Sequence, residues 1–104
     1  MILIAALTIS FLNASPGERV YRVTASAPAG SKVTLRVNAP SGWVAAFCTA
    51  SVCARDSVTT AAPASGTVHA ELHLYKNGRP QPGMAVITDN FGQRGIIEVP
   101  YPVG

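Results

Sequence analysis

The chain has 104 residues, of which 48% are hydrophobic and only 12% charged, and its formal net charge is +3. A chain of this length builds one hydrophobic core, and its apolar fraction excludes intrinsic disorder, so a single domain over residues 1–104 is expected. The charged fraction is about half of the roughly 25% typical of soluble domains, so uncharged residues must fill much of the surface.

The basic residues are scattered along the chain. The nearest approach to a basic stripe is Arg22, Lys32 and Arg36, which are expected on two neighbouring strands. Proteins that bind nucleic acid concentrate positive charge so that several phosphates are neutralised together. We therefore expect no nucleic-acid partner.

Residues 1–12 contain an apolar run from position 2 to position 12. This length suits the core of a signal peptide but is too short to span a bilayer. The run lacks a basic start, and cleavage after Ser15 would leave Pro16 as the first residue. Its second half alternates with a period of two, as in a strand. Three interpretations stay open: a first strand of the fold, a signal or membrane-anchoring remnant, and an extension that pairs with a neighbouring subunit.

Turn signals separate the rest of the chain into short segments whose apolar residues also alternate with a period of two. After the first run, strands are expected near residues 21–25, 32–38, 43–48, 67–75, 84–88 and 96–101. Residues 54–60 are less regular, and no segment sustains a helical period. About seven strands without a confident helix predict an all-β sandwich.

Each expected strand has one apolar face, and these faces define the expected core. Trp43 shares a face with Phe47, so we place its ring in the core rather than on the surface as a platform for stacking sugars. The expected core residues are Val33, Leu35, Val37, Trp43, Phe47, Leu72 and Leu74.

Cys48 and Cys53 are the only cysteines of the sequence. A structural zinc site needs four ligands, and a redox dithiol is usually Cys-x-x-Cys beside a helix start. A short-range disulfide fits better, and closing its small loop would add about 2 kcal/mol of stability. Disulfides persist outside the reducing cytosol, so we expect an extracytoplasmic protein: periplasmic, on the cell surface or secreted. Two buried free thiols in a cytosolic protein remain the alternative.

One segment resembles a known family. Pro40-Ser41-Gly42-Trp43 runs on to Phe47-Cys48, and Cys53 follows after four further residues. This pattern is similar to the immunoglobulin-like β-sandwich modules of secreted and cell-surface bacterial proteins, in which a strand begins P-x-G-W, ends F-C and precedes a short disulfide loop. The resemblance covers roughly residues 15–100 and is most specific around residues 43–53. It implies an immunoglobulin-like sandwich with a non-catalytic role, as a spacer, an adhesive or carbohydrate-associated domain, or a docking subunit.

His69, Glu71 and His73 occupy alternate positions of one expected strand and therefore share a face. The two histidines would lie about 13 Å apart along the strand, whereas ligands of one ion lie near 2.1 Å from it. One histidine with Glu71 and a residue of a neighbouring strand can still bind copper or zinc. We expect no metal and no cofactor, with these three residues as weak candidates.

No serine lies in a Gly-x-Ser-x-Gly turn, and the acidic residues are spread over separate elements, so no catalytic residue and no enzymatic activity are expected. Three aromatic residues at strand ends or in turns are weak candidates for a binding site: Tyr75, Phe91 and Tyr101. Phe91 is the best of them, since an aromatic residue in an exposed loop is a common anchor for a partner.

These observations favour a non-catalytic structural or accessory subunit that packs on a larger extracytoplasmic or membrane-associated protein assembly. The low charge motivates this hypothesis, because a free domain usually carries about 25 to 35% charged surface. Two alternatives remain: a cell-surface module that binds carbohydrate or another ligand, and a periplasmic metal-binding protein. Contact with a membrane is expected only through such a complex or through the N-terminal apolar run.

Overall fold

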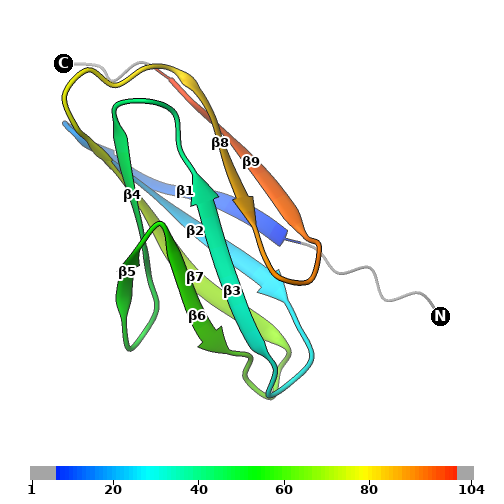
Figure 1. Ribbon diagram of the computed structural model, residues 1–104. Helices are drawn as coiled ribbons and strands as arrows, with labels where there is room; N and C mark the ends of the chain where they lie inside the picture. The colour runs from blue at the N-terminus through cyan, green and yellow to red at the C-terminus, as the bar shows by residue number, and fades with distance from the viewer. Residues whose placement is uncertain (1–6, 101–104) are drawn as a thin grey trace.

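The structure is a computed structural model that describes residues 7–100 (Figure 1). Within this range the chain forms nine strands and no helix, so no helix there could cross a membrane. The all-β prediction is confirmed, with two strands more than the sequence indicated. The strands are β1 (Leu7–Ser15), β2 (Glu18–Ser26), β3 (Lys32–Asn38), β4 (Trp43–Cys48), β5 (Cys53–Arg55), β6 (Ser57–Ala61), β7 (Thr67–Lys76), β8 (Gly83–Thr88) and β9 (Arg94–Val99).

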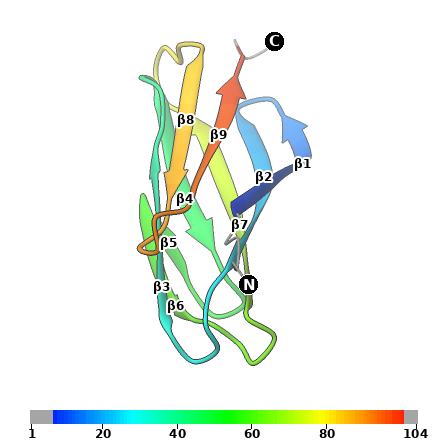
Figure 2. The same ribbon diagram turned by 90° about the vertical axis from the view of Figure 1, so that its right-hand side faces the viewer.

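The strands form two antiparallel sheets that face each other as the layers of a sandwich (Figure 2). The strand order is β1-β2-β7-β4-β5 in the five-stranded sheet and β6-β3-β8-β9 in the four-stranded sheet. Side chains alternate between the core and the outside along most strands, as the pleat of a β-strand requires. The largest fully buried side chains are Phe47, Leu35, Leu72, Leu74, Ile87, Val23, Val33 and Val99.

The residues expected in the core lie between the two sheets. Trp43 is buried, and its indole Nε1 donates a hydrogen bond of 3.1 Å to the backbone oxygen of Gln81. The ring is thus held inside the fold and presents no open face to a sugar. Val37, near the end of β3, is half-buried and packs against the core from its margin.

The Cys48–Cys53 disulfide is present and confirms the pairing expected from the sequence. The two residues are direct cross-strand partners in the β4–β5 hairpin, with their Cα atoms 4.0 Å apart. Strand β5 has only three residues, so few backbone hydrogen bonds hold it on β4. The covalent bond therefore supplies much of what attaches this short edge strand.

Asp56 carries the chain from one sheet to the other, between β5 and β6. Its φ of +67° lies in the left-handed region, which aspartate enters more readily than most residues. Its N–H donates to the Ala45 oxygen in β4, and its C=O accepts from the Val37 N–H in β3, both at 3.0 Å. The backbone of Asp56 is thus hydrogen-bonded to both sheets.

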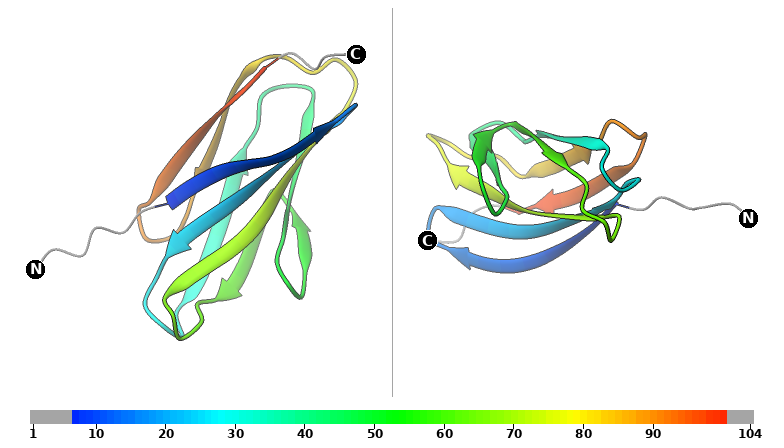
Figure 3. Two further views of the ribbon diagram at one scale, coloured as in Figure 1. Left: turned by 180° about the vertical axis from the view of Figure 1, so that it is seen from behind. Right: turned by 90° about the horizontal axis from the view of Figure 1, so that it is seen from below.

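The N-terminal apolar run enters the fold as far as it is described. Strand β1 pairs with β2 along its whole length, with a register irregularity between Phe11 and Asn13. The beginning of β1 lies beside β9 (Figure 3). There Leu7 and Ile9 pack so closely on Gly95 that a Cβ at this glycine would lie 2.6 Å from a carbon of each side chain. Residues 2–6 of the expected strand lie outside the described residues.

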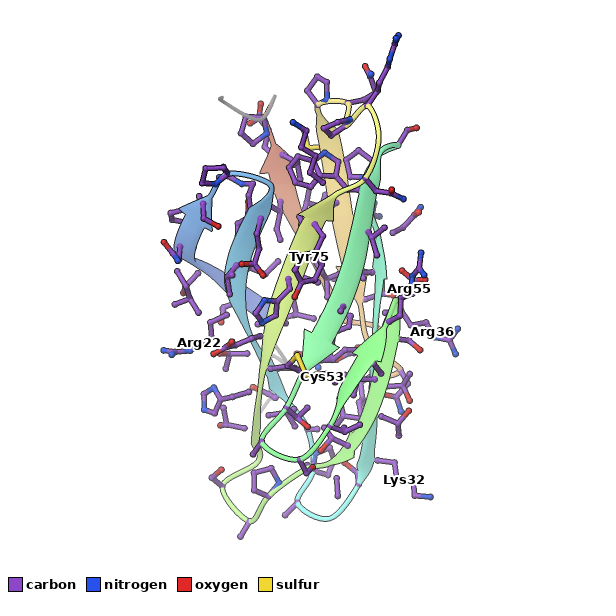
Figure 4. All side chains as sticks on the ribbon, turned by 90° about the vertical axis from the view of Figure 1, so that its left-hand side faces the viewer. Arg22, Lys32, Arg36, Cys53, Arg55 and Tyr75 are labelled. Carbon is purple, nitrogen blue, oxygen red and sulfur yellow. A yellow bond between two sulfur atoms is a disulfide. The ribbon has the colours of Figure 1, made fainter. Side chains whose placement is uncertain are left out.

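The expected grouping of Arg22, Lys32 and Arg36 on two neighbouring strands is wrong. Strand β2 belongs to the five-stranded sheet and β3 to the four-stranded sheet, because the loop between them crosses from one layer to the other. Figure 4 shows Arg22 on one side of the molecule, with Lys32 and Arg36 on the other. These three charges do not form one basic stripe.

Candidate interaction surface

The outer face of the five-stranded sheet gathers titratable side chains around His73. Its Nδ1 lies 3.1 Å from Glu18 Oε2 and its Nε2 lies 3.2 Å from Glu71 Oε1. Glu18 and Glu71 are distant in sequence, and only the pairing of β2 with β7 brings both carboxylates to this ring. Both ring nitrogens of His73 thus lie within hydrogen-bond distance of a carboxylate of the same chain; a neutral ring can donate to one of them and a protonated ring to both.

His69, Glu71 and His73 do share this face, as expected from their alternate positions, but only Glu71 and His73 meet. His69 Nδ1 lies 3.3 Å from Thr24 Oγ1, at a separate point of the strand. In the part of the chain that the structure describes, no three His, Cys, Asp or Glu side chains are arranged to hold a metal ion.

Tyr75 extends this polar face by one more outward position of β7. Its ring stacks on His73, with the ring centroids 5.9 Å apart and the planes 11° from parallel. Burial against its neighbours raises the pKa of the Tyr75 hydroxyl, and the negative charge of Glu18 together with a hydrogen bond to Glu18 raises it further. The phenol is therefore held in its neutral form over a wider pH range than a free tyrosine.

A hollow of about 370 Å³ lies beside the disulfide on the same face. Arg22 and Glu71 in its lining are cross-strand partners, so one positive and one negative charge stand next to each other. Both cysteines are oxidised, which leaves the hollow without a thiol nucleophile. Its lining consists of Arg22, Cys48, Thr49, Ala50, His69, Ala70 and Glu71.

The outer face of the four-stranded sheet is different, because large apolar side chains are exposed there. Met84 on β8 is 57% exposed and Ile96 on β9 is 55% exposed. Val86 lies between them as the direct cross-strand partner of Ile96 and is half-buried. We call Met84, Val86 and Ile96 the apolar face.

Charged groups border the apolar face. Arg94 and Glu98 lie on the same side of β9, two residues before and two after Ile96, and both are exposed. Beside them is a hollow of about 340 Å³. Its lining consists of Arg36, Val37, Asn38, Val86, Thr88 and Arg94. The apolar side chains are thus flanked by polar and charged groups, the usual arrangement of a protein interface.

Sequence reasoning did not single out the apolar face, although one signal for it is visible. Ile96 and Ile97 are adjacent, and neighbouring residues of a strand point to opposite faces. When Ile97 enters the core, Ile96 must therefore point outward, as the structure shows. Met84 follows a Gly and Pro-rich turn, and its outward direction depends on where β8 begins.

Phe91 lies in the β8–β9 loop and is 41% exposed. The loop has a defined shape, because Asp89 Oδ1 accepts hydrogen bonds from the backbone N–H of Phe91 at 2.9 Å and of Gln93 at 2.8 Å. Asn90 fastens the loop to β3: its Oδ1 accepts from the Thr34 N–H at 2.8 Å, and its Nδ2 donates to the Lys32 oxygen at 3.0 Å.

The expected aromatic candidates do not form one site. Tyr75 is paired with the first residue of β2, whereas the β8–β9 loop is hydrogen-bonded through Gln93 to the backbone oxygen of Ser26, the last residue of β2. At roughly 3.3 Å per residue these two points are about 26 Å apart along the strand. Tyr101 lies outside the described residues.

Neither a protein-family model nor a curated protein matches this chain.

Proposed function

We propose that the protein is a non-catalytic structural or accessory subunit that docks on a larger extracytoplasmic protein assembly through the apolar face. The observation that carries this proposal is the exposure of Met84 and Ile96 on adjacent strands, with Val86 between them. Burying two such side chains against a partner would contribute on the order of 1 to 2 kcal/mol each. Grouped exposed apolar side chains are a common mark of a protein interface.

Three further properties support the proposal. The sequence is only 12% charged, so much of the surface lacks the charge that keeps a free domain dispersed. The Cys48–Cys53 bond favours an oxidising compartment, such as the periplasm, the cell surface or the extracellular space. The polar groups around His73 are paired within the chain, which suits a scaffold more than a reacting centre.

The experiment compares complexes of the native host, separated by size under non-denaturing conditions. The wild-type chain should migrate in a complex with other proteins, and Met84→Ser should release it. Val52→Ser is the matched control, because Val52 is an apolar residue that is 46% exposed but lies in the β4–β5 hairpin of the other sheet. Equal migration of both variants with the wild type would contradict docking through the apolar face.

A second candidate function is the binding of a carbohydrate or another extracellular ligand through Phe91. It is favoured by the combination of an exposed ring and a loop backbone fixed by Asp89 and Asn90, since little freedom would be lost on binding. A glycan array probed with the wild type and with Phe91→Ala tests it. Binding that disappears in the variant supports this candidate, and an array without any bound sugar excludes it for carbohydrates.

A further inference from the structure

Four strands lie at sheet edges in the described part of the chain: β1, β5, β6 and β9. Edge strands expose unpaired backbone groups, and proteins usually protect them by short length, irregularity or polar residues. Strand β5 has three residues, β1 contains a register irregularity, and β6 carries Ser57 and Thr59 on its outer side. Strand β9 has six residues in regular register with β8 and exposes Ile96.

The direction of the free backbone groups of β9 follows from the hydrogen bond that closes its hairpin. The Asp89 N–H donates to the Gln93 oxygen at 3.2 Å. Hydrogen-bonded pairs alternate with non-bonded pairs in an antiparallel ladder, so the next bonded pairs are those of Gly95, Ile97 and Val99 with β8. The N–H and C=O groups of the residues between them point away from β8; these are Arg94, Ile96 and Glu98.

The opposite side of β8 gives an independent check of this alternation. The Thr34 N–H is bonded to the side chain of Asn90, at the position that continues the Arg36–Thr88 and Asn38–Val86 pairs of the β3–β8 ladder. The backbone groups of Val86 and Thr88 therefore point toward β3, and those of Gly83, Ala85 and Ile87 point toward β9, as the hairpin requires.

We propose that β9 pairs antiparallel with β9 of a second copy of this chain, in the register that places Ile96 opposite Ile96 of the second copy. In this register Arg94 lies opposite Glu98 of the second copy, and Glu98 lies opposite its Arg94. Every outward-pointing N–H and C=O of these three residues then finds a partner. A parallel arrangement in register would instead place like charges opposite each other, which is unfavourable.

Within residues 7–100, the contact between β1 and β9 involves the core-facing side of β9 and not its outward-pointing residues. Leu7 and Ile9 of β1 pack on Gly95, whose side faces the core, whereas Arg94, Ile96 and Glu98 point to the outside. Pairing joins two four-stranded sheets into one continuous sheet and places the two apolar faces next to each other. The use of this widened face for docking rests on the proposed function, but the pairing itself rests only on β9.

The test uses charge reversal and sedimentation at increasing protein concentration. The wild type should form a dimer. Arg94→Glu and Glu98→Arg each place like charges opposite each other twice and should weaken dimerisation by about tenfold or more. An equimolar mixture of the two variants should associate again, because each chain then meets opposite charges. Arg79→Glu is the control, since it makes the same change of charge at an exposed loop position and should leave dimerisation unchanged.

A second variant tests the backbone pairing. Ile96→Pro removes an N–H that points away from β8, so the fold should persist while the dimer is lost. A wild type that stays monomeric up to millimolar concentration, or a mixture of charge variants that does not associate, would overturn the pairing. Met84→Ser lies outside the β9 register and should leave the dimer intact, so the failure of docking and the failure of pairing give different results.

Discussion

The two outer faces of the sandwich differ in what their side chains contact. On the five-stranded sheet, His73 lies between Glu18 and Glu71, and Cys48 is bonded to Cys53. On the four-stranded sheet, the apolar face is exposed and the backbone of β9 is unpaired on one side within the described residues. The titratable groups of the first face lie against each other within the chain, whereas the second face leaves apolar side chains and backbone groups of β9 exposed. The difference teaches that a cluster of titratable groups on a face does not by itself mark a functional site, because such groups can pair with each other.

The largest effect is expected at the Cys48–Cys53 disulfide, which fixes β5 to the five-stranded sheet. Cys48→Ser opens a small loop and should lower the free energy of unfolding by about 2 kcal/mol, because the unfolded chain regains the entropy that the bond removes. Denaturant unfolding of the variant and of the oxidised wild type measures this difference. Cys53→Ser should give the same value, and dimerisation through β9 should not change; a loss of dimerisation would show that the two faces are coupled.

The next effect concerns the β8–β9 loop, which joins the two strands that carry the apolar face. Asn90→Ala removes two hydrogen bonds to the backbone of β3 and should cost about 1 to 2 kcal/mol. Hydrogen exchange should show faster exchange of the Thr34 amide than in the wild type. Asn77→Ala, at an exposed loop position, is the control. Unchanged exchange at Thr34 would contradict the role given to Asn90.

A smaller effect is expected at His73. His73→Gln removes the imidazole between Glu18 and Glu71. With the ring protonated in the wild type, the free energy of unfolding should fall by less than about 1 kcal/mol, since partly exposed ion pairs contribute little. Thermal unfolding at low and high salt measures it, and the difference between variant and wild type should shrink at high salt. A loss of several kcal/mol would contradict this view, because it would mean that the contacts of His73 contribute far more than partly exposed pairs do.

The smallest effect is a pH dependence of stability from Tyr75. Its pKa is raised above the ordinary value of 10.0, so the folded state holds this proton more tightly than the unfolded state. The resulting stabilisation is fully present below pH 10 and is lost as the pH rises from 10 through the higher folded pKa. Denaturant unfolding below and above pH 10 should show this loss in the wild type, a smaller one in Glu18→Gln and none from this position in Tyr75→Phe. An equal loss in all three proteins would assign it to other groups.

The strands that were predicted well from the sequence are those with one clear apolar face. Strand β7 alternates from Val68 to Leu74, and β4 alternates from Trp43 to Phe47, so both strands and their inward sides could be identified. Strands β5 and β6 were missed because three residues give no period and because Val58 is the only large apolar residue in β6. Strand β5 is held by the disulfide, and β6 follows Asp56, whose backbone is hydrogen-bonded to both sheets. Neither strand shows a clear hydrophobic pattern of its own.

The candidate surfaces were harder to predict, because they depend on contacts between distant residues. Glu18 reaches His73 only through the pairing of β2 with β7, and no local sequence pattern predicts this contact. Gln93 is buried, although it is polar, and its Nε2 donates to the Ser26 oxygen at 2.8 Å. The direction of Ile96 depends on the register of β9. Alternation within one strand shows which side chains share a face, but the assembly of strands decides what they meet.

Asp56 gives the sandwich a mechanical property. Its backbone N–H and C=O are hydrogen-bonded to Ala45 in one layer and to Val37 in the other. The two layers cannot slide past each other at this point without breaking these bonds. Near the beginning of β1 the layers are linked in a second way: Leu7 and Ile9 pack on Gly95, and Gln93 Nε2 donates to the Ser26 oxygen. The four-stranded sheet is therefore anchored to the other layer next to both of its edge strands, by backbone hydrogen bonds beside β6 and by a side-chain hydrogen bond beside β9.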